Sequence, residues 1–264
     1  MIDFHNHILP NVDDGSKSLK MSISMLKNAS EQGITDVVNT VHYQHPKVDG
    51  VDISYETILK KRDELQSELE NKSINIKIHI GAEVYFFPNL TKIVDDKLST
   101  IGKGNFMLIE FSPNLIPLTQ KKTLFDLKMS GVTPIIAHPE RYKPVQKDIG
   151  LVYDWLLAGC LIQIDAGSIL GKFGKSAKST SKMIIKNKWC QIMGSDAHDN
   201  KKRNFILKDS LKEVKNLIGK DAELLVTQNP YDVLNGNEIS VEIDSVYSYE
   251  EKHNMWDKFV DKLF

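Results

Sequence analysis

The amino-acid sequence predicts an α/β fold in which parallel strands alternate with helices. Two observations support this prediction: short β-branched runs recur along the chain, and longer segments with apolar residues at helical spacing lie between them. Such alternation is typical of a mostly parallel sheet with crossover helices, and about seven strand–helix units are enough to close a (β/α) barrel. An open, doubly wound sheet is the alternative fold.

The predicted strands are short apolar runs bounded by polar or turn-forming residues. They are IDFHNH at 2–7, DVVNTVH at 36–42, NIKIHIGAE at 75–83, FMLIE at 106–110, TPIIAH at 133–138, LIQID at 161–165 and CQIMGSD at 190–196. Several of them end on a histidine or a carboxylate.

Helical periodicity marks the segments between the strands. The clearest examples are 17–32, 54–71, 119–130 and 146–158, and three of these are followed directly by glycine, which commonly terminates helices. The many Lys and Glu residues of 54–71 indicate a solvated face. Near the C-terminus, Trp256, Phe259, Val260 and Leu263 form an apolar stripe, so we expect a short amphipathic helix at about 250–264 that packs on the barrel or on another subunit of a homo-oligomer.

Composition sets the class of protein. With 264 residues, 41% of them apolar, the chain can bury one large core, and we expect a single domain spanning 1–264. The net charge of −1 gives no sign of a nucleic-acid-binding surface. The sequence shows no leader and no membrane span, and its two cysteines, Cys160 and Cys190, resemble small buried hydrophobes, so we expect a cytoplasmic protein.

Imidazoles and carboxylates gather at the C-terminal ends of the predicted strands. In a parallel barrel these ends meet at one rim, where active sites are built. Such a cluster would repel itself or be poorly solvated without compensating cations, so the sequence predicts a metal site. The strand-end residues are His5, His7, His42, Glu83, Glu110, His138, Asp196 and His198.

The number of candidate ligands exceeds what one ion needs. Three protein ligands suffice for a catalytic metal with open positions, so eight or nine candidates indicate two or three ions. A carboxylate that bridges ions is expected among them, most naturally Glu83. Nitrogen and oxygen ligands without thiolates suit manganese, iron or zinc, of which Mn²⁺ is our first expectation.

Six motifs carry a resemblance to a known family. DFHNHILPNVDDGS, HYQHP, GAEVYF, LIEF, IIAHPERY and GSDAH resemble the successive motifs of the polymerase and histidinol phosphatase (PHP) superfamily. Their order and spacing are most similar to the bacterial capsule- and exopolysaccharide-operon protein-tyrosine phosphatases, the CpsB/CapC family. The similarity runs from residue 1 to about residue 235.

This resemblance implies a distorted (β/α)7 barrel with three metal ions and a phosphotyrosine phosphatase activity. The implied ligand sets are His5, His7, Glu83 and Asp196; Glu83, Glu110 and His138; and Asp14, His42 and His198. It also implies that Arg141 and Arg203 bind the substrate phosphate and that His42 is part of the catalytic group. The implied substrate is the phosphorylated C-terminal tail of a membrane-associated tyrosine autokinase, whose dephosphorylation regulates capsular polysaccharide synthesis.

Metal-assisted hydrolysis is consistent with these residues. A hydroxide bridging two ions would attack phosphorus without a covalent phosphoenzyme, and the two arginines would bind the phosphoryl oxygens. The cysteine-dependent route needs an arginine six positions after the cysteine, but Ala166 and Asp196 stand at these positions. Two alternatives stay open: a histidinol-phosphate phosphatase or other small-molecule phosphoesterase, and a non-catalytic metal-containing scaffold that binds the kinase tail.

Several nearby polar residues have more ordinary interpretations. We expect His79 to be a hydrogen-bonded histidine of the interior and His45 to shape the loop at the rim. Without the resemblance, the residues do not decide whether Asp13 or Asp14 is a ligand. The aromatic residues Tyr85, Phe86 and Phe87 are expected to pack in the core rather than to stack on a substrate ring.

Overall fold

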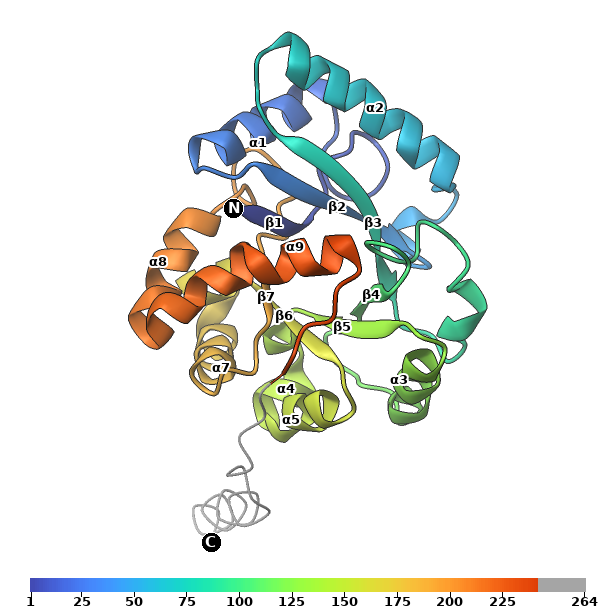
Figure 1. The fold of residues 1–264 in the computed structure, drawn as a ribbon, viewed down its shortest axis with the longest axis vertical. Coiled ribbons are helices and arrows are strands. Elements are labelled where there is room, and N and C mark those ends of the chain that lie inside the picture. The colour runs from blue at the N-terminus through green and yellow to red at the C-terminus, as the bar shows by residue number, and fades with distance from the viewer. Residues whose placement is uncertain (242–264) are drawn as a thin grey trace, which may run out of the picture.

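Seven short apolar segments form the central sheet in the computed structural model, which describes residues 1–241 (Figure 1). All neighbouring strands are parallel and follow one another in chain order. They are β1 (Ile2–Asn6), β2 (Asp36–Tyr43), β3 (Lys77–Tyr85), β4 (Phe106–Glu110), β5 (Thr133–Ala137), β6 (Leu161–Asp165) and β7 (Ile192–Gly194). The seven predicted strands are therefore confirmed.

The sheet curves round until β7 lies beside β1. The Asp196 amide donates to the His5 carbonyl at 2.7 Å, and the His7 amide donates to the Ala197 carbonyl at 2.8 Å. An isolated parallel bridge joins Asn6 to Ala197. Because these contacts lie beyond the end of β7 and the β1–β2 register is irregular, the barrel is distorted. The (β/α) barrel is thus confirmed over the open, doubly wound sheet.

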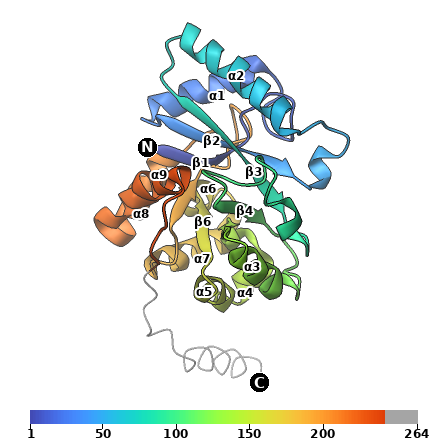
Figure 2. The same cartoon turned by 45° about the vertical axis from the view of Figure 1, so that its right-hand side comes forward.

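Helices surround the barrel on the outside (Figures 1 and 2). The α-helices are α1 (Leu19–Glu31), α2 (Tyr55–Asn71), α3 (Gln120–Met129), α4 (Lys143–Lys147), α5 (Gly150–Leu157), α6 (Ala166–Leu170), α7 (Gly174–Lys186), α8 (Leu207–Ile218) and α9 (Gln228–Asn235). Short 3₁₀ turns are η1 (Pro46–Val48), η2 (Leu90–Ile93), η3 (Pro139–Arg141) and η4 (Gly219–Val226).

Three of the four predicted helices appear as expected, and the fourth differs. The predicted helix at 146–158 is two helices, α4 and α5, because Asp148 adopts an extended conformation (φ −137°, ψ 96°) and its side chain accepts from the Gly150 amide at 2.9 Å. In α2, only Ile58, Leu65 and Leu69 are buried, which confirms its solvated face. The amphipathic helix predicted at about 250–264 lies outside the described residues.

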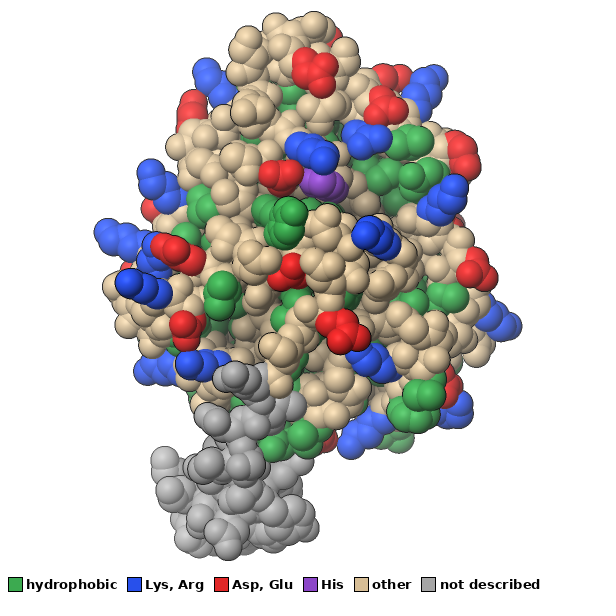
Figure 3. All heavy atoms as spheres, in the orientation of Figure 1, with side chains coloured by type: hydrophobic (Ala, Val, Ile, Leu, Met, Phe, Trp, Pro, Cys, Tyr) green, Lys and Arg blue, Asp and Glu red, His purple; other side chains and the backbone are tan. Residues whose placement is uncertain are grey.

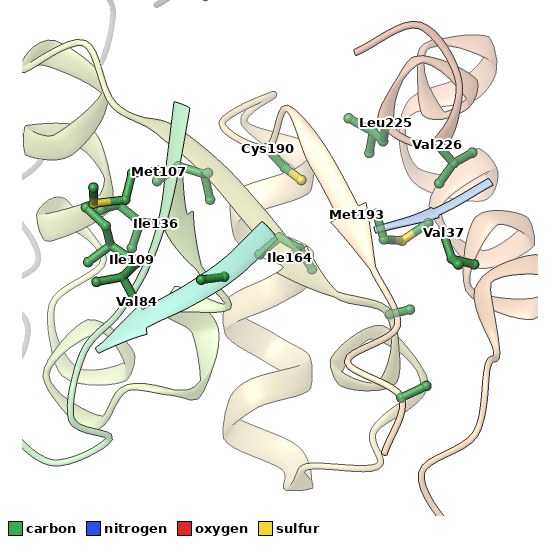
Figure 4. Packing of buried hydrophobic residues seen from close by; sticks show 14 of the residues in the cluster. Val37, Val84, Met107, Ile109, Ile136, Ile164, Cys190, Met193, Leu225 and Val226 are labelled. Carbon is green, nitrogen blue, oxygen red and sulfur yellow. The ribbon is translucent and has the colours of Figure 1, made fainter. Parts of the chain in front are cut away.

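Apolar side chains fill two layers of the core. The outer layer lies between the strands and the helices, and Figure 4 shows part of it around Val84, Ile109 and Ile136. The inner layer fills the barrel near its N-terminal end, where Val233 of α9 packs with Ile2 and its neighbours. Helix α9 therefore closes the end of the barrel opposite the strand C-termini, which leaves that other rim for polar side chains.

The two thiols are buried, and charges of both signs share the visible surface. Cys160 and Cys190 are free and buried in the core. On the face shown in Figure 3, basic and acidic side chains are interspersed rather than segregated by sign. Within residues 1–241, no helix is both long and apolar enough to cross a membrane.

Candidate metal centre

The C-terminal ends of the strands bring all nine predicted ligands to one rim. Eight of them are buried, and the Asp14 side chain is 35% exposed. Among the strand-end residues, His138 and Asp196 have left-handed backbone conformations, with φ of 32° and 48°. Such conformations are uncommon for residues with a Cβ and concentrate at functional sites. Both side chains lie in the cluster, that of His138 beside Glu83 and that of Asp196 beside His5 and His7.

Glu83 lies at the centre of the cluster. Its Oε1 is 2.8 Å from His138 Nε2, and its Oε2 is 3.1 Å from His42 Nδ1. The same Oε2 lies 3.4 Å from His5 Nε2 and 3.6 Å from His7 Nε2. One carboxylate thus faces four imidazoles, with its two oxygens directed to different groups, which is the arrangement expected of a bridging ligand.

The predicted ligands form four overlapping groups, two of which include Glu83. The donor atoms within each group lie within 4.8 Å of one another. The groups are His5, His7 and Asp196; His5, Glu83 and His138; His42, Glu83 and Glu110; and His7, Asp14, His42 and His198. The His42 ring spans two of them, because its Nε2 is 3.1 Å from Asp14 Oδ1 while its Nδ1 faces Glu83.

The chemistry of this donor set fits divalent cations. Burial works to raise the pKa of Glu83, but His5 and the other imidazoles hold it well below its usual range, so the carboxylate is charged. Burial works to lower the pKa of His5, yet Glu83 and Asp196 raise it to about 9. The buried carboxylates therefore need compensating positive charge nearby, which either protonated imidazoles or a metal ion can supply. Nitrogen and oxygen donors suit manganese, iron or zinc alike.

Asp13 and Asp14 have different places in the structure. Asp13 Oδ2 lies 2.8 Å from His7 Nδ1, and Asp13 Oδ1 accepts from the Gly15 amide at 2.9 Å. Burial works to raise the pKa of Asp13, but His7 lowers it to about 2. Asp13 therefore orients His7, whereas Asp14 faces His42 and His198. Gly15 is required here, since a Cβ would lie 2.2 Å from the His7 carbonyl oxygen.

Two further buried residues support the first strand, and of these Gln163 was not found from the sequence. Gln163 of β6 places its Oε1 3.0 Å from His5 Nδ1, which leaves Nε2 of His5 directed toward Glu83 and Asp196. Asp3 accepts from the Ser195 amide at 3.0 Å and so fixes the chain just before Asp196. The available signal for Gln163 was a lone polar residue inside the apolar run LIQID.

Arg141 and Arg203 converge on the edge of the cluster. Arg141 Nη1 and Arg203 Nη2 each donate to Asp196 Oδ2 at 2.5 Å, and Arg141 Nη1 also lies 3.3 Å from Asp165 Oδ2. Their side chains are 24% and 32% exposed. Burial works to lower the pKa of Arg141, but Asp196 and Asp165 raise it, so the guanidinium is always charged. The two guanidinium groups thus lie between the buried donors and solvent, where an anion could reach them.

The remaining candidates lie around the mouth of the site or away from it. The His45 ring stacks on His42 at 4.6 Å between centroids and meets Tyr85 edge-on at 4.7 Å, so it shapes the rim as expected. Phe86 is buried against Phe111 in the core. His79 is only partly buried, and its Nε2 is 3.0 Å from Asp36 Oδ1, well down the barrel from the cluster.

Comparisons with known proteins find a matching family model and named relatives. Residues 1–235 match the family model described as capsular polysaccharide synthesis, CpsB/CapC. A putative tyrosine-protein phosphatase CapC of Staphylococcus aureus is 34% identical over 216 residues, covering 81% of this chain and 84% of that protein. The tyrosine-protein phosphatase YwqE of Bacillus subtilis is 30% identical over 231 residues, covering 87% and 89%.

Solved structures extend the comparison to the fold. A crystal structure from work on YwqE of B. subtilis and CpsB of Streptococcus pneumoniae, described as unique metal-dependent tyrosine phosphatases, superimposes with a TM-score of 0.86 at 28% identity, covering 92% of this chain and 97% of that one. The histidinol phosphate phosphatase of Lactococcus lactis shares the fold, with a TM-score of 0.57 at 14% identity and coverage of 84% and 93%.

Proposed function

The chain belongs to the CpsB/CapC family of capsular polysaccharide synthesis proteins, and on this premise we propose that it is a metal-dependent protein-tyrosine phosphatase. The relatives that carry tyrosine phosphatase names align with it over most of their length. The observation that carries the proposal is the juxtaposition of nine buried or half-buried metal donors with Arg141 and Arg203 at their edge. Donors for cations and donors for a phosphate thus share one site.

The proposed metal-binding residues form three sets, of which the first two share Glu83. His5, His7, Glu83 and Asp196 would hold one ion, Glu83, Glu110 and His138 a second, and Asp14, His42 and His198 a third. Close donor atoms support the first and third sets, and His7 is also close to the third. In the second set, His138 Nε2 lies 2.8 Å from Glu83 and 3.9 Å from Glu110, which also groups with His42. Mn²⁺ is the proposed ion. When bound, such ions supply Lewis acidity, which activates water and neutralises the charge on phosphoryl oxygens.

The chain's own residues bind and orient the phosphate. Arg141 and Arg203 would donate in-plane N–H groups to its oxygens, and Asp196 and Asp165 keep the Arg141 guanidinium in place. The cysteines take no part, because burial raises the pKa of both Cys160 and Cys190 to about 12 and removes them from the rim. The phenolate of tyrosine, with a solution pKa of about 10, is a fair leaving group.

Site depth favours an aryl phosphate on a protein chain. The imidazoles of His5 and His7 are fully buried, whereas the arginines are partly exposed, so a phosphate that meets both the ions and the arginines would lie inward of the substrate backbone. Phosphotyrosine has the longest reach of the common phosphorylated side chains. We propose that the substrate is the phosphorylated C-terminal tail of a bacterial tyrosine autokinase that controls capsule synthesis, and that the reaction takes place in the cytoplasm, where buried free thiols stay reduced.

The decisive experiment compares substrates on the same enzyme. Full-length protein loaded with Mn²⁺ is assayed on a phosphotyrosyl peptide and on histidinol phosphate, before and after chelation. We expect turnover of the peptide to dominate, to vanish with the chelator and to return with Mn²⁺. A preference for histidinol phosphate would overturn the substrate assignment, and the absence of turnover on both substrates at high enzyme concentration would instead favour a scaffold.

A pair of arginine variants tests the phosphate contact. Arg141→Lys keeps the charge but loses the planar fork, so kcat/KM should fall about tenfold to a hundredfold, which corresponds to the ~1.5–3 kcal/mol of a charge-assisted hydrogen bond. Arg62→Lys is the matched control, because Arg62 lies on α2 and donates to the Ile78 carbonyl outside the site. Equal activity of the two variants would refute the role given to Arg141.

A further inference from the structure

An aromatic side chain outside the metal cluster contacts both phosphate-binding arginines. The Phe173 ring centroid lies 4.6 Å from Arg141 Cζ and 5.8 Å from Arg203 Cζ. Both distances fall within the roughly 6 Å over which a cation is attracted to an aromatic face. Arg141 lies in η3, Phe173 in the connection between α6 and α7, and Arg203 in the loop after β7.

The local backbone holds this ring in place. Gly171 ends α6 with φ +85° and Gly174 follows the phenylalanine with φ +92°, conformations that residues with a Cβ rarely adopt. The Lys172 amide donates to the Gly167 carbonyl at 2.9 Å. Phe173 Cε2 would lie only 2.7 Å from a Cβ at Gly167, so the ring packs directly on the first turn of α6. Residue 173 is thus fixed over the rim by its own turn.

The two arginines need such support because they crowd each other. Both donate to the same oxygen, Asp196 Oδ2, and like charges at this separation repel. The other oxygen of Asp196 faces His5 and His7, so its charge is shared with the metal cluster. Asp165 already pairs with Arg141, and a further carboxylate at position 173 would occupy N–H donors and repel a phosphate. An aromatic face attracts the cations without using their in-plane donors.

We propose that Phe173 is a positioning residue that holds the guanidinium groups of Arg141 and Arg203 in the orientation that binds phosphate. The inference rests on the proposed function only in taking the substrate phosphate to bind these arginines. The ring acts through them and not on the tyrosyl group of the substrate. Its effect therefore extends to any phosphate at the site, including the free ion.

The test removes the aromatic face and keeps an apolar side chain. Phe173→Leu and Phe173→Met lack the ring, Phe173→Tyr retains it, and Phe125→Leu is the control, since Phe125 is a 59% exposed phenylalanine of α3. Binding of inorganic phosphate to the manganese-loaded full chain is measured by calorimetry, and kcat and KM are measured on a phosphotyrosyl peptide. Melting temperature and metal content report whether each variant keeps its fold.

We expect phosphate binding to weaken about three- to tenfold in both ring-free variants at unchanged metal content, with the peptide KM rising by a similar factor. The Phe173→Tyr and Phe125→Leu variants should stay within about twofold of the wild type. Unchanged phosphate binding in a folded ring-free variant would overturn the proposal, whether or not the peptide KM rises, and so would a wild type that binds no phosphate. Because phosphate binding needs no turnover, this result is independent of whether phosphotyrosine is the substrate.

Discussion

Replacing Asp13 by asparagine should weaken metal binding without removing any proposed ligand. Asp13 Oδ2 faces His7 Nδ1 at 2.8 Å and also accepts from the His42 amide at 3.3 Å, while Oδ1 accepts from the Gly15 amide at 2.9 Å. Both oxygens therefore act as acceptors. An asparagine has one oxygen and one NH₂ group, so in either orientation a donor would face a donor in a buried site.

The size of the effect follows from these contacts. His7 would lose the negative charge that fixes its ring and that strengthens its other nitrogen as a ligand. Loss of such an orienting partner typically lowers metal affinity about 10- to 100-fold, which is roughly 1.4–2.7 kcal/mol. The affinity should fall because the substitution removes a charge: with a pKa of about 2, Asp13 is ionised throughout the physiological pH range.

Competition with a chelating dye measures this affinity directly. Asp95→Asn is the control, because Asp95 is an exposed aspartate near η2 and the substitution makes the same change of charge. We expect the control to match the wild type and Asp13→Asn to bind Mn²⁺ at least tenfold more weakly while remaining folded. An affinity of Asp13→Asn within twofold of the wild type would refute the orienting role assigned to Asp13.

Three further outcomes are expected. Because burial raises the pKa of Cys160 and Cys190 to about 12, iodoacetamide should leave phosphatase turnover intact, and inactivation that parallels alkylation would contradict this. Burial lowers the pKa of His79 below its ordinary 6.5, so the unfolded state takes up a proton first as pH falls. The free energy of unfolding by urea should therefore decrease from pH 7.5 to 5.5, and it should decrease less in His79→Asn. Equal pH dependence of the unfolding free energy in the two proteins would exclude this contribution. Gly194→Ala would place a Cβ 2.6 Å from His5 Cβ, so the free energy of unfolding from thermal melts should fall by about 1–3 kcal/mol. A fall below about 0.5 kcal/mol would argue against that close packing.

Local patterns were sufficient to predict the barrel. Each strand is a short apolar run, and in a parallel barrel the polar residue at its end must face the same rim as the others. Glu83 and His138 could therefore be placed together although they come from different strands, and their side chains are 2.8 Å apart. The positions of strand-end residues were predictable because the C-terminal ends of all strands of a parallel barrel lie at the same rim.

Residues that act through tertiary contacts could not be predicted in this way. Asp13 and Asp14 are adjacent in sequence, and only the conformation of the loop decides which of them faces His7. Gln163 reaches His5 across the inside of the barrel, and Phe173 reaches the arginines because of its flanking glycines. The break between α4 and α5 likewise depends on one backbone conformation, which helical periodicity does not record.

Anomalous X-ray scattering from crystals grown with Mn²⁺ tests the central claim most directly, since it locates the ions themselves. The proposed sets predict anomalous peaks on both sides of the Glu83 carboxylate, one beside His138 and Glu110 and another beside His5 and Asp196. Crystals with fully ordered Glu83 and His5 side chains but no anomalous peak within coordination distance of them would contradict a metal centre at this rim.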